Sequence, residues 1–487
     1  MRRISPTSWV TAQNLFKQLF MIALFAIQAP LLGPKAFGLI ALVMVFVGFC
    51  EYVLEITGTD ALISIRDIEP QHYSTMTTVN VVAATIMGAG IFVFAPAIAG
   101  NFHEPQLIPI LRVMSALPML TVLTAAPNAA CRRDLDFQPL VTRQLISVVA
   151  GGVVGLVLTF MDYGVWALVW QATVQRVLNV AILWKLVKLP FQMGFSPRHF
   201  QDLKRFGTPM LISQGMSWGA DQIPRYILGL FLGASELGLF SLASRLSDTV
   251  LQLAVSPRYA VARIEMRRFA ENREGIQDFT RNVLTHISVL TFPLCLGAAA
   301  VMPLLFTTWL NARWAGGVIP AQLMMLGILP YVTHYALSAA LMGTNNQSKI
   351  AFNATVQTIT LVLVSIIFAP MGLIIATAAI ACRPLLTASI PVYFARKYCG
   401  LGTRLAIQGQ LRPFTAAAVM AGVVYGLEIA LRGHISDGAL LVGVIAVGAA
   451  TYATLICVLL PQVAKPVLAR LRGRPEPSDG SDPARLG

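Results

Sequence analysis

Long runs of apolar residues dominate this chain and leave few folds open to it. Backbone N–H and C=O groups inside a bilayer must be paired within the protein, so only helices and closed barrels can span it. The runs lack strand alternation and exceed the length of barrel strands, which leaves helices of about 20 residues each. The predicted spans are 9–31, 36–56, 73–99, 107–130, 140–160, 163–185, 206–232, 236–258, 283–308, 318–342, 349–368, 371–395, 413–431 and 438–460.

The small share of charged residues supports the same interpretation. Only 12% of the 487 residues are charged, against about 25% in an average soluble domain. A soluble fold of this length needs a polar shell, which so few charges cannot provide. The composition therefore excludes an ordinary cytosolic enzyme, a secreted disulfide scaffold and a disordered chain.

The positions of the basic residues predict the orientation. If the N-terminus is cytoplasmic, 27 of the 36 Lys and Arg residues, Arg143 among them, fall on the inside, and only Lys35, Arg313 and Arg432 lie in outside loops. Cytoplasmic loops of membrane proteins carry such an excess. We therefore expect an even number of helices with both termini in the cytoplasm. The same excess explains the net charge of +14 without a nucleic-acid partner.

Two turns that lie 200 residues apart share one sequence pattern. Residues 32–39 and 232–239 both fit L-G-x-x-x-[FL]-G-L. A weaker sequence similarity, called here the weaker echo, relates residues 164–168 to residues 372–376. Six spans separate the members of each pair, so the repeats have the same orientation in the membrane. We expect two pseudo-symmetric six-helix lobes followed by two further helices. The predicted boundaries are an N-terminal lobe at 1–190, a cytoplasmic linker at 191–205, a C-terminal lobe at 206–396, two extra helices at 397–460 and a disordered cytoplasmic tail at 461–487.

Ionisable residues inside the predicted spans indicate a candidate site. Such side chains are costly in the bilayer and usually face a cavity or a partner. Most of them lie on the first two spans of each lobe, and equivalent helices can face each other across a central axis. We therefore expect a polar cavity between the lobes. Its candidate substrate-binding residues are Lys17, Arg225, Arg245, Arg176, Arg383, Gln171 and Gln175, and its candidate ion-coupling acids are Glu51, Asp221 and Asp248.

Structural roles stay open for four of these charged residues. Asp221 and Arg225 are spaced i, i+4, and Arg245 and Asp248 are spaced i, i+3. Each pair can therefore neutralise itself within its own helix. The alternative is that the four side chains face the cavity.

The sixth and twelfth spans leave similar alternatives. Arg176 and Arg383 could bind backbone carbonyls instead of a substrate. Gln171, Gln175 and Asn179 form a stripe at i, i+4, i+8 that could join helices by hydrogen bonds.

The chemistry of the candidate residues favours an anionic substrate. The planar guanidinium of arginine pairs with two phosphate oxygens at once and stays charged. An unpaired intramembrane carboxylate is the usual place for a coupling H⁺ or Na⁺. The sequence contains no His/Cys cluster typical of a metal site, and we expect no bound cofactor.

Several segments resemble one family of membrane proteins. They read GTDALI at 58–63, ACRRDLDF at 130–137 and YGVWAL at 163–168, with Phe206-Gly207 and the stretch 227–243 further on. The sequence is similar in these segments to the Wzx-type oligosaccharide flippases, which belong to a superfamily with multidrug and polysaccharide exporters.

The resemblance implies a function and its partners. It implies a flippase that moves a polyprenyl-diphosphate-linked oligosaccharide across the bacterial inner membrane, by alternating access of two lobes, for exopolysaccharide or O-antigen synthesis. It also implies a cationic cavity between the lobes and coupling to H⁺ or Na⁺. Expected partners are the lipid-linked substrate and the bilayer, with a polysaccharide polymerase and a chain-length regulator as further candidates.

Two other functions are weighed against this one. A multidrug-type cation antiporter predicts a net acidic cavity, whereas six basic and four acidic residues lie in the spans. A membrane polysaccharide polymerase or glycosyltransferase usually carries a sizeable outer loop or an acidic catalytic motif. The predicted outer loops are short and carry few acids, so we expect a transporter and not an enzyme.

Overall fold

The computed structural model describes residues 6–463 except Arg66, 188–192, 256–257, 259–261, 263–264, 267–272 and Asn345. The predicted disordered tail lies outside the described residues from position 464 onward. Within the described ranges the chain is helical and forms no β-strand. The principal helices are α1 (Pro6–Glu55), α3 (Pro70–Asn101), α4 (Leu107–Met114), α5 (Leu117–Arg133), α6 (Gln138–Phe160), α7 (Val165–Leu186), α8 (Pro197–Val250), α10 (Arg273–Trp309), α11 (Val318–Gly343), α12 (Gln347–Phe368), α13 (Leu373–Leu386), α14 (Ser389–Phe394), α15 (Thr403–Leu431) and α16 (Asp437–Leu459).

The helices confirm the predicted all-α polytopic membrane fold. Among the described residues, 11 helices are long and apolar enough to cross a membrane. Two of them, in α1 and α8, are bent at an internal glycine, so each of these helices supplies two of the predicted spans. Helix α7 has 22 residues and corresponds to the predicted span 163–185.

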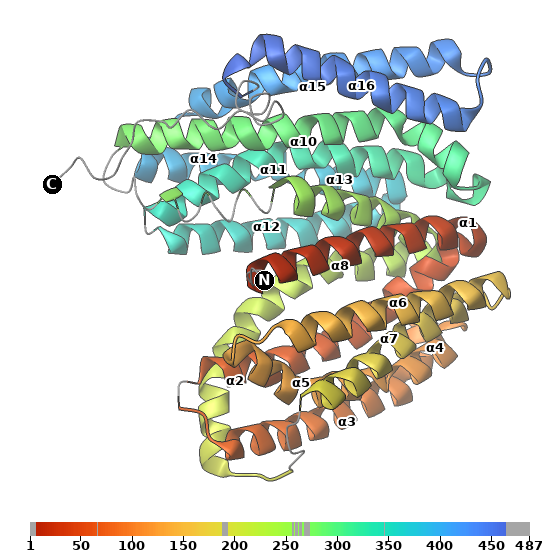
Figure 1. The fold of residues 1–487 in the computed structure, drawn as a ribbon, viewed down its shortest axis with the longest axis vertical. Helices are drawn as coiled ribbons and strands as arrows, with labels where there is room; N and C mark the ends of the chain where they lie inside the picture. The colour runs from red at the N-terminus through yellow and green to blue at the C-terminus, as the bar shows by residue number, and fades with distance from the viewer. Residues whose placement is uncertain are drawn as a thin grey trace, which may run out of the picture. The chain divides into compact units, whose positions relative to one another are not determined.

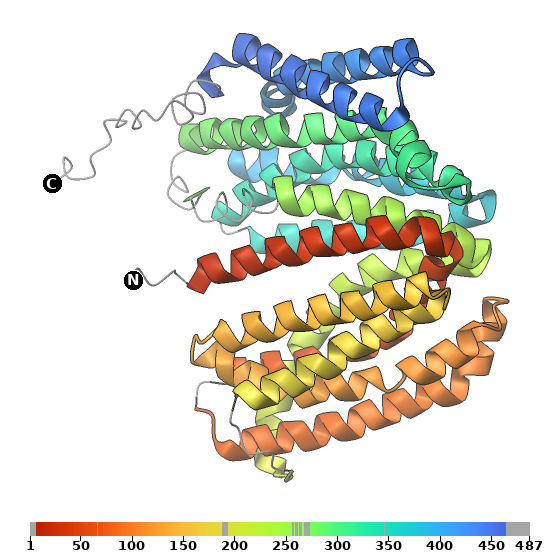
Figure 2. The same ribbon diagram turned by 45° about the vertical axis from the view of Figure 1, so that its right-hand side comes forward.

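The chain divides into two compact units. Unit 1 comprises 1–241, 309–314 and 361–376, and unit 2 comprises 242–308, 315–360 and 377–487. Within unit 1, α6 and α7 lie side by side, as do α3 and α5 (Figure 1). Within unit 2, α15 and α16 form a helical hairpin (Figure 2), and both pack on α10 around Leu304. The lobe boundaries expected at 190 and 206 stay a prediction.

Two predicted spans are interrupted, where the sequence analysis expected continuous helices. The span 107–130 is divided into α4 and α5, and the span 371–395 into α13 and α14. Proline lacks the N–H that would bond the carbonyl four residues earlier. Pro118 and Pro391 each lie close after one of these interruptions, and neither can donate a backbone hydrogen bond to the carbonyl four residues earlier. After the second interruption the carbonyl of Thr387 accepts from the N–H of Ile390 instead, at 3.2 Å.

The backbone confirms that the repeated turns are equivalent. Gly33 has φ 73° and ψ 170°, and Gly233 has φ 82° and ψ 177°. The weaker echo also starts at two glycines with positive φ, Gly164 and Gly372. Residues with a side chain rarely adopt this region, so glycine is required where both long helices bend.

The second glycine of each repeat docks against the other repeat. A Cβ atom on Gly38 would lie 1.7 Å from the carbonyl oxygen of Ala234, and a Cβ atom on Gly238 would lie 1.9 Å from that of Pro34. Both distances are far inside van der Waals contact. The contact is therefore reciprocal, as expected for two like turns related by a local two-fold axis.

A distant segment completes the bend in α1. Pro34 has no N–H to offer to the carbonyl of Pro30, and that carbonyl accepts a hydrogen bond of 2.6 Å from Asn311 Nδ2. The neighbouring carbonyl of Ala29 accepts one of 2.9 Å from Trp314 Nε1. The bend thus leaves neither of these buried carbonyls unpaired.

Candidate functional site

Close packing of α6 on α7 positions the polar stripe of unit 1. A Cβ atom on Gly155 would lie 2.2 Å from Gln171 Oε1, and one on Gly151 would lie 2.9 Å from Gln175 Cβ. Glycines spaced by four residues let two helix backbones approach in this way. Gln171 Oε1 also accepts a hydrogen bond of 2.9 Å from Gln28 Nε2 on α1. The interhelical role considered for Gln171 is therefore present in the structure.

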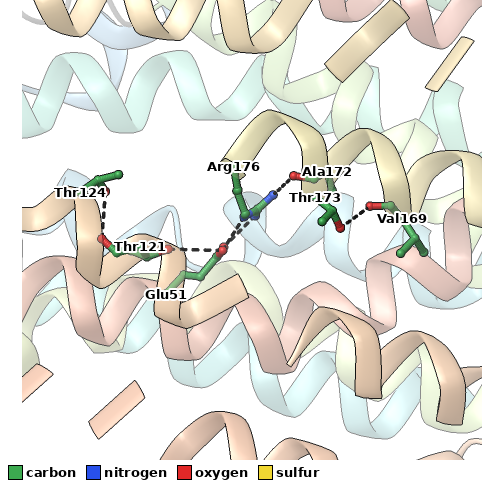
Figure 3. Close-up of polar contacts among 7 residues, drawn as sticks. All are labelled: Glu51, Thr121, Thr124, Val169, Ala172, Thr173 and Arg176. Carbon is green, nitrogen blue, oxygen red and sulfur yellow. Dashed lines mark hydrogen bonds and ion pairs between the residues drawn. The ribbon is translucent and has the colours of Figure 1, made fainter. Parts of the chain in front are cut away.

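One turn further along α7, Arg176 binds Glu51 of α1 (Figure 3). Arg176 Nε donates to Glu51 Oε1 at 2.5 Å, and Arg176 Nη2 donates to Glu51 Oε2 at 2.8 Å. Thr121 of α5 donates to the same carboxylate at 3.5 Å, and Arg176 Nη1 donates to the carbonyl of Ala172 at 3.3 Å. The arginine and glutamate side chains are only 24% and 17% exposed.

This bidentate contact makes one neutral unit from two charges. Fork-to-fork pairing of guanidinium and carboxylate is among the strongest polar contacts in proteins. Both charges are largely removed from solvent, and each relies on the other to offset the cost. The sequence predicted Arg176 for substrate binding and Glu51 for ion coupling, whereas in the structure the two side chains bind each other.

A polar cavity of about 160 Å³ lies beside this pair within unit 1. Three of its side chains have buried polar atoms without a hydrogen bond: Asn128 Oδ1, Asn179 Oδ1 and Arg143 Nε. Glu55 also lines it, 3.8 Å from Arg132. The complete lining is Glu55, Thr59, Leu120, Thr121, Thr124, Asn128, Arg143, Arg176 and Asn179.

Most of this cavity was not predicted from the sequence. Arg143 was among the basic residues predicted to lie on the cytoplasmic side. A signal was nevertheless present: Thr121, Thr124 and Asn128 are spaced i, i+3, i+7 and so share one face of an apolar helix. Asn179 was recognised only as part of the stripe on α7.

The other candidate residues are distributed over both units. Lys17 and Asp221 are exposed in unit 1, where Arg225 is half-buried and Gln175 packs beside Gly151. Unit 2 contains the remaining ones, which are Arg245, Asp248 and Arg383. The guanidinium of Arg383 lies 5.5 Å from the ring centre of Tyr331. The cavity expected between the lobes, and the roles of these residues in it, stay predictions.

The fold is similar to two solved transporters. The lipid II flippase MurJ in an inward closed conformation aligns with a TM-score of 0.74 at 13% identity, covering 93% of this chain and 99% of that one. An inward-facing multidrug resistance MATE family transporter of the MOP superfamily aligns with a TM-score of 0.60 at 15% identity, covering 79% and 94%. At these identities the likeness establishes the fold.

Curated relatives come from polysaccharide biosynthesis. The succinoglycan biosynthesis transport protein ExoT of Rhizobium meliloti is 25% identical over 62% of this chain and 58% of its own length. The lipopolysaccharide biosynthesis protein WzxC of Escherichia coli K12 is 20% identical over 67% of each chain. The aligned region thus spans little more than half of the ExoT protein.

A family of polysaccharide biosynthesis proteins matches residues 27–319. This region is more than half of the chain and runs from within α1 to beyond the end of α10, with the Glu51–Arg176 pair, the polar cavity and both repeated turns. The match accords with the resemblance seen in the sequence. The chain belongs to this polysaccharide biosynthesis protein family.

Proposed function

We propose that this protein is a flippase that moves a polyprenyl-diphosphate-linked oligosaccharide across the bacterial inner membrane for exopolysaccharide or O-antigen synthesis. The observation that carries the proposal is the alignment of 93% of the chain with the fold of a lipid II flippase, in a chain of the polysaccharide biosynthesis family. The multidrug transporters share the fold, so it is the family that favours a lipid-linked saccharide over a drug.

Alternating access of two lobes is the mechanism that we propose. The two equivalent turns support it, because like-oriented repeats are typical of transporters whose two halves rock against each other. The bulky saccharide would cross in the separate cavity predicted between the lobes, where Lys17, Arg225 and Arg245 are the candidate contacts for the diphosphate.

Coupling to an H⁺ or Na⁺ gradient is part of the proposal. Its candidate groups are Glu51, Asp221 and Asp248, the acids predicted for this role. The contact of Glu51 with Arg176 supports a switch, because neutralising the carboxylate would release a guanidinium fixed on α7. Both termini in the cytoplasm, and docking of a polymerase and a chain-length regulator, complete the proposal.

Transport in liposomes tests the function directly. Purified protein is reconstituted with a fluorescent polyprenyl-diphosphate-linked oligosaccharide, and the fraction of lipid accessible to an external quencher is followed under imposed H⁺ or Na⁺ gradients. We expect protein-dependent movement between leaflets that responds to one of the two gradients. Movement equal to that in protein-free liposomes, with folded protein present, would refute the flippase.

A further inference from the structure

Arg143 is a half-buried cation without a counter-charge in contact. Among the described residues its guanidinium makes neither a hydrogen bond nor an ion pair, and its Nε is shielded from solvent. The nearby Glu55 carboxylate lies 3.8 Å from Arg132, which also approaches Asp60 at 3.6 Å. Burying an unpaired charge is strongly unfavourable, so a side chain in this position indicates a partner of opposite charge.

Two amides face the same cavity, and their side chains form no hydrogen bond with the described part of the protein. Asn128 is only 7% exposed, and both its Oδ1 and the Oδ1 of Asn179 are buried without a partner. An amide can turn to present either its oxygen or its two N–H donors, because the two orientations have the same shape. Arg143 and the two amides therefore offer several unused donors toward one space.

The other charges of the cavity are already compensated. Glu51 takes up the charge of Arg176 through two hydrogen bonds. Among the described charged residues of the lining, Arg143 alone forms no ion pair, and the Glu55 carboxylate attracts it only from beyond contact distance. The cavity of about 160 Å³ is several times larger than the roughly 30 Å³ that one water molecule occupies in the liquid. The space is thus large enough for a small tetrahedral anion.

We propose that this cavity of unit 1 binds a phosphate-type oxyanion, which Arg143 holds by its charge and Asn128 and Asn179 hold by their amides. Two sources have this chemistry: free phosphate and the diphosphate of a lipid carrier. Assignment to the carrier rests on the proposed function. In the predicted orientation the cavity lies toward the cytoplasmic ends of α1 and α6, where such a carrier would be loaded.

Thermal unfolding of the full chain in nanodiscs tests the site. Inorganic phosphate is compared with chloride at equal ionic strength, for wild type, Arg143→Gln and Arg112→Gln. Arg112 is a matched control, because it is an exposed arginine of unit 1 whose guanidinium lies 5.2 Å from the ring centre of Phe92. Phosphate should raise the unfolding temperature of wild type and Arg112→Gln, and its affinity should fall about ten- to a hundredfold in Arg143→Gln.

A second readout separates a binding residue from a structural one. Without phosphate, Arg143→Gln should unfold at the wild-type temperature or above, because the substitution removes a half-buried charge that has no ion pair. A lower unfolding temperature, no effect of phosphate on wild type, or an equal response of Arg143→Gln and wild type would each overturn the proposal.

Competition identifies the source of the anion. Farnesyl diphosphate, a short lipid diphosphate, is titrated into wild-type protein in the presence of phosphate. Displacement at the Arg143-dependent site assigns the site to the carrier, whereas phosphate binding without displacement assigns it to free phosphate. The assay measures binding only, so its result is independent of whether the protein transports lipid in liposomes.

Discussion

At the scale of single residues, the Glu51–Arg176 contact brings together two side chains that are 125 positions apart in the sequence. Periodicity and charge show that each lies inside a membrane span, but they carry no information about which helices are neighbours. The sequence therefore predicted two separate functional charges, whereas the packing of α7 near α1 brings the two side chains into direct contact. Arg143 shows the converse, because a residue assigned to the cytoplasmic surface lies against a cavity.

Removing either partner of this pair should cost more than removing both. Arg176→Met or Glu51→Leu alone leaves an uncompensated, largely buried charge and should destabilise the protein by roughly 3–5 kcal/mol. The double variant leaves no charge and should recover most of that loss. Unfolding of detergent-solubilised protein, followed by fluorescence-detected gel filtration after heating, measures the effect. Additive losses in the double variant would contradict a direct coupling.

At the scale of elements, the contact between α6 and α7 depends on the absence of side chains at two positions. Gly151 and Gly155 were not singled out from the sequence, because glycine is frequent in membrane helices and only the distance to Gln171 shows its importance here. The bends at Gly33 and Gly233 could be foreseen, since a repeated motif shows a shared local requirement. Local backbone geometry depends on adjacent residues and can be predicted from them. Which helices pack together depends on residues far apart in the sequence and cannot be predicted in this way.

Adding one methyl group at Gly155 should separate the two helices. Its Cβ would lie 2.2 Å from Gln171 Oε1 and 2.8 Å from Gln171 Cβ, so Gly155→Ala should destabilise the protein by about 1–3 kcal/mol. Gly90→Ala on α3 is the matched control, because a Cβ there meets nothing within 4 Å. The control should be neutral or slightly stabilising, since alanine favours helix. Equal thermal stabilities for the two variants would exclude the contact.

The two docked turns should respond alike to substitution. In Gly38→Ala and Gly238→Ala the new Cβ meets a backbone carbonyl, which cannot move aside as a side chain can. Both variants should lose most of their folded yield, to a similar extent. Gly422→Ala in α15 has open space and should express as wild type. A large difference between Gly38→Ala and Gly238→Ala would argue against their structural equivalence.

At the scale of the whole molecule, the predictions of helix number and of orientation rest on summed properties to which many residues contribute. The runs of apolar residues and the excess of Lys and Arg remain evident even when the predicted span boundaries are wrong by a few positions. For that reason the all-α polytopic fold could be predicted. The interruptions after Met114 and Leu386 could not, because proline is tolerated in many membrane helices.

The predicted orientation has a direct test. Alkaline phosphatase is active only outside the cytoplasm, so a fusion after Gly433, in the turn between α15 and α16, should be active. A fusion after Asn346, just before α12, should be inactive. The opposite pattern, or activity in both fusions, would refute a cytoplasmic N-terminus.

The hydrogen bonds from Asn311 and Trp314 to the carbonyls of Pro30 and Ala29 also constrain biogenesis. A growing chain leaves the ribosome N-terminus first, so the first bend enters the membrane long before its two donors have been synthesised. Until then both carbonyls must find water or a temporary donor, because lipid offers none. The bend in α1 can therefore be completed only after 281 to 285 further residues have been synthesised, and a nascent chain released before residue 314 would lack the Trp314 donor permanently.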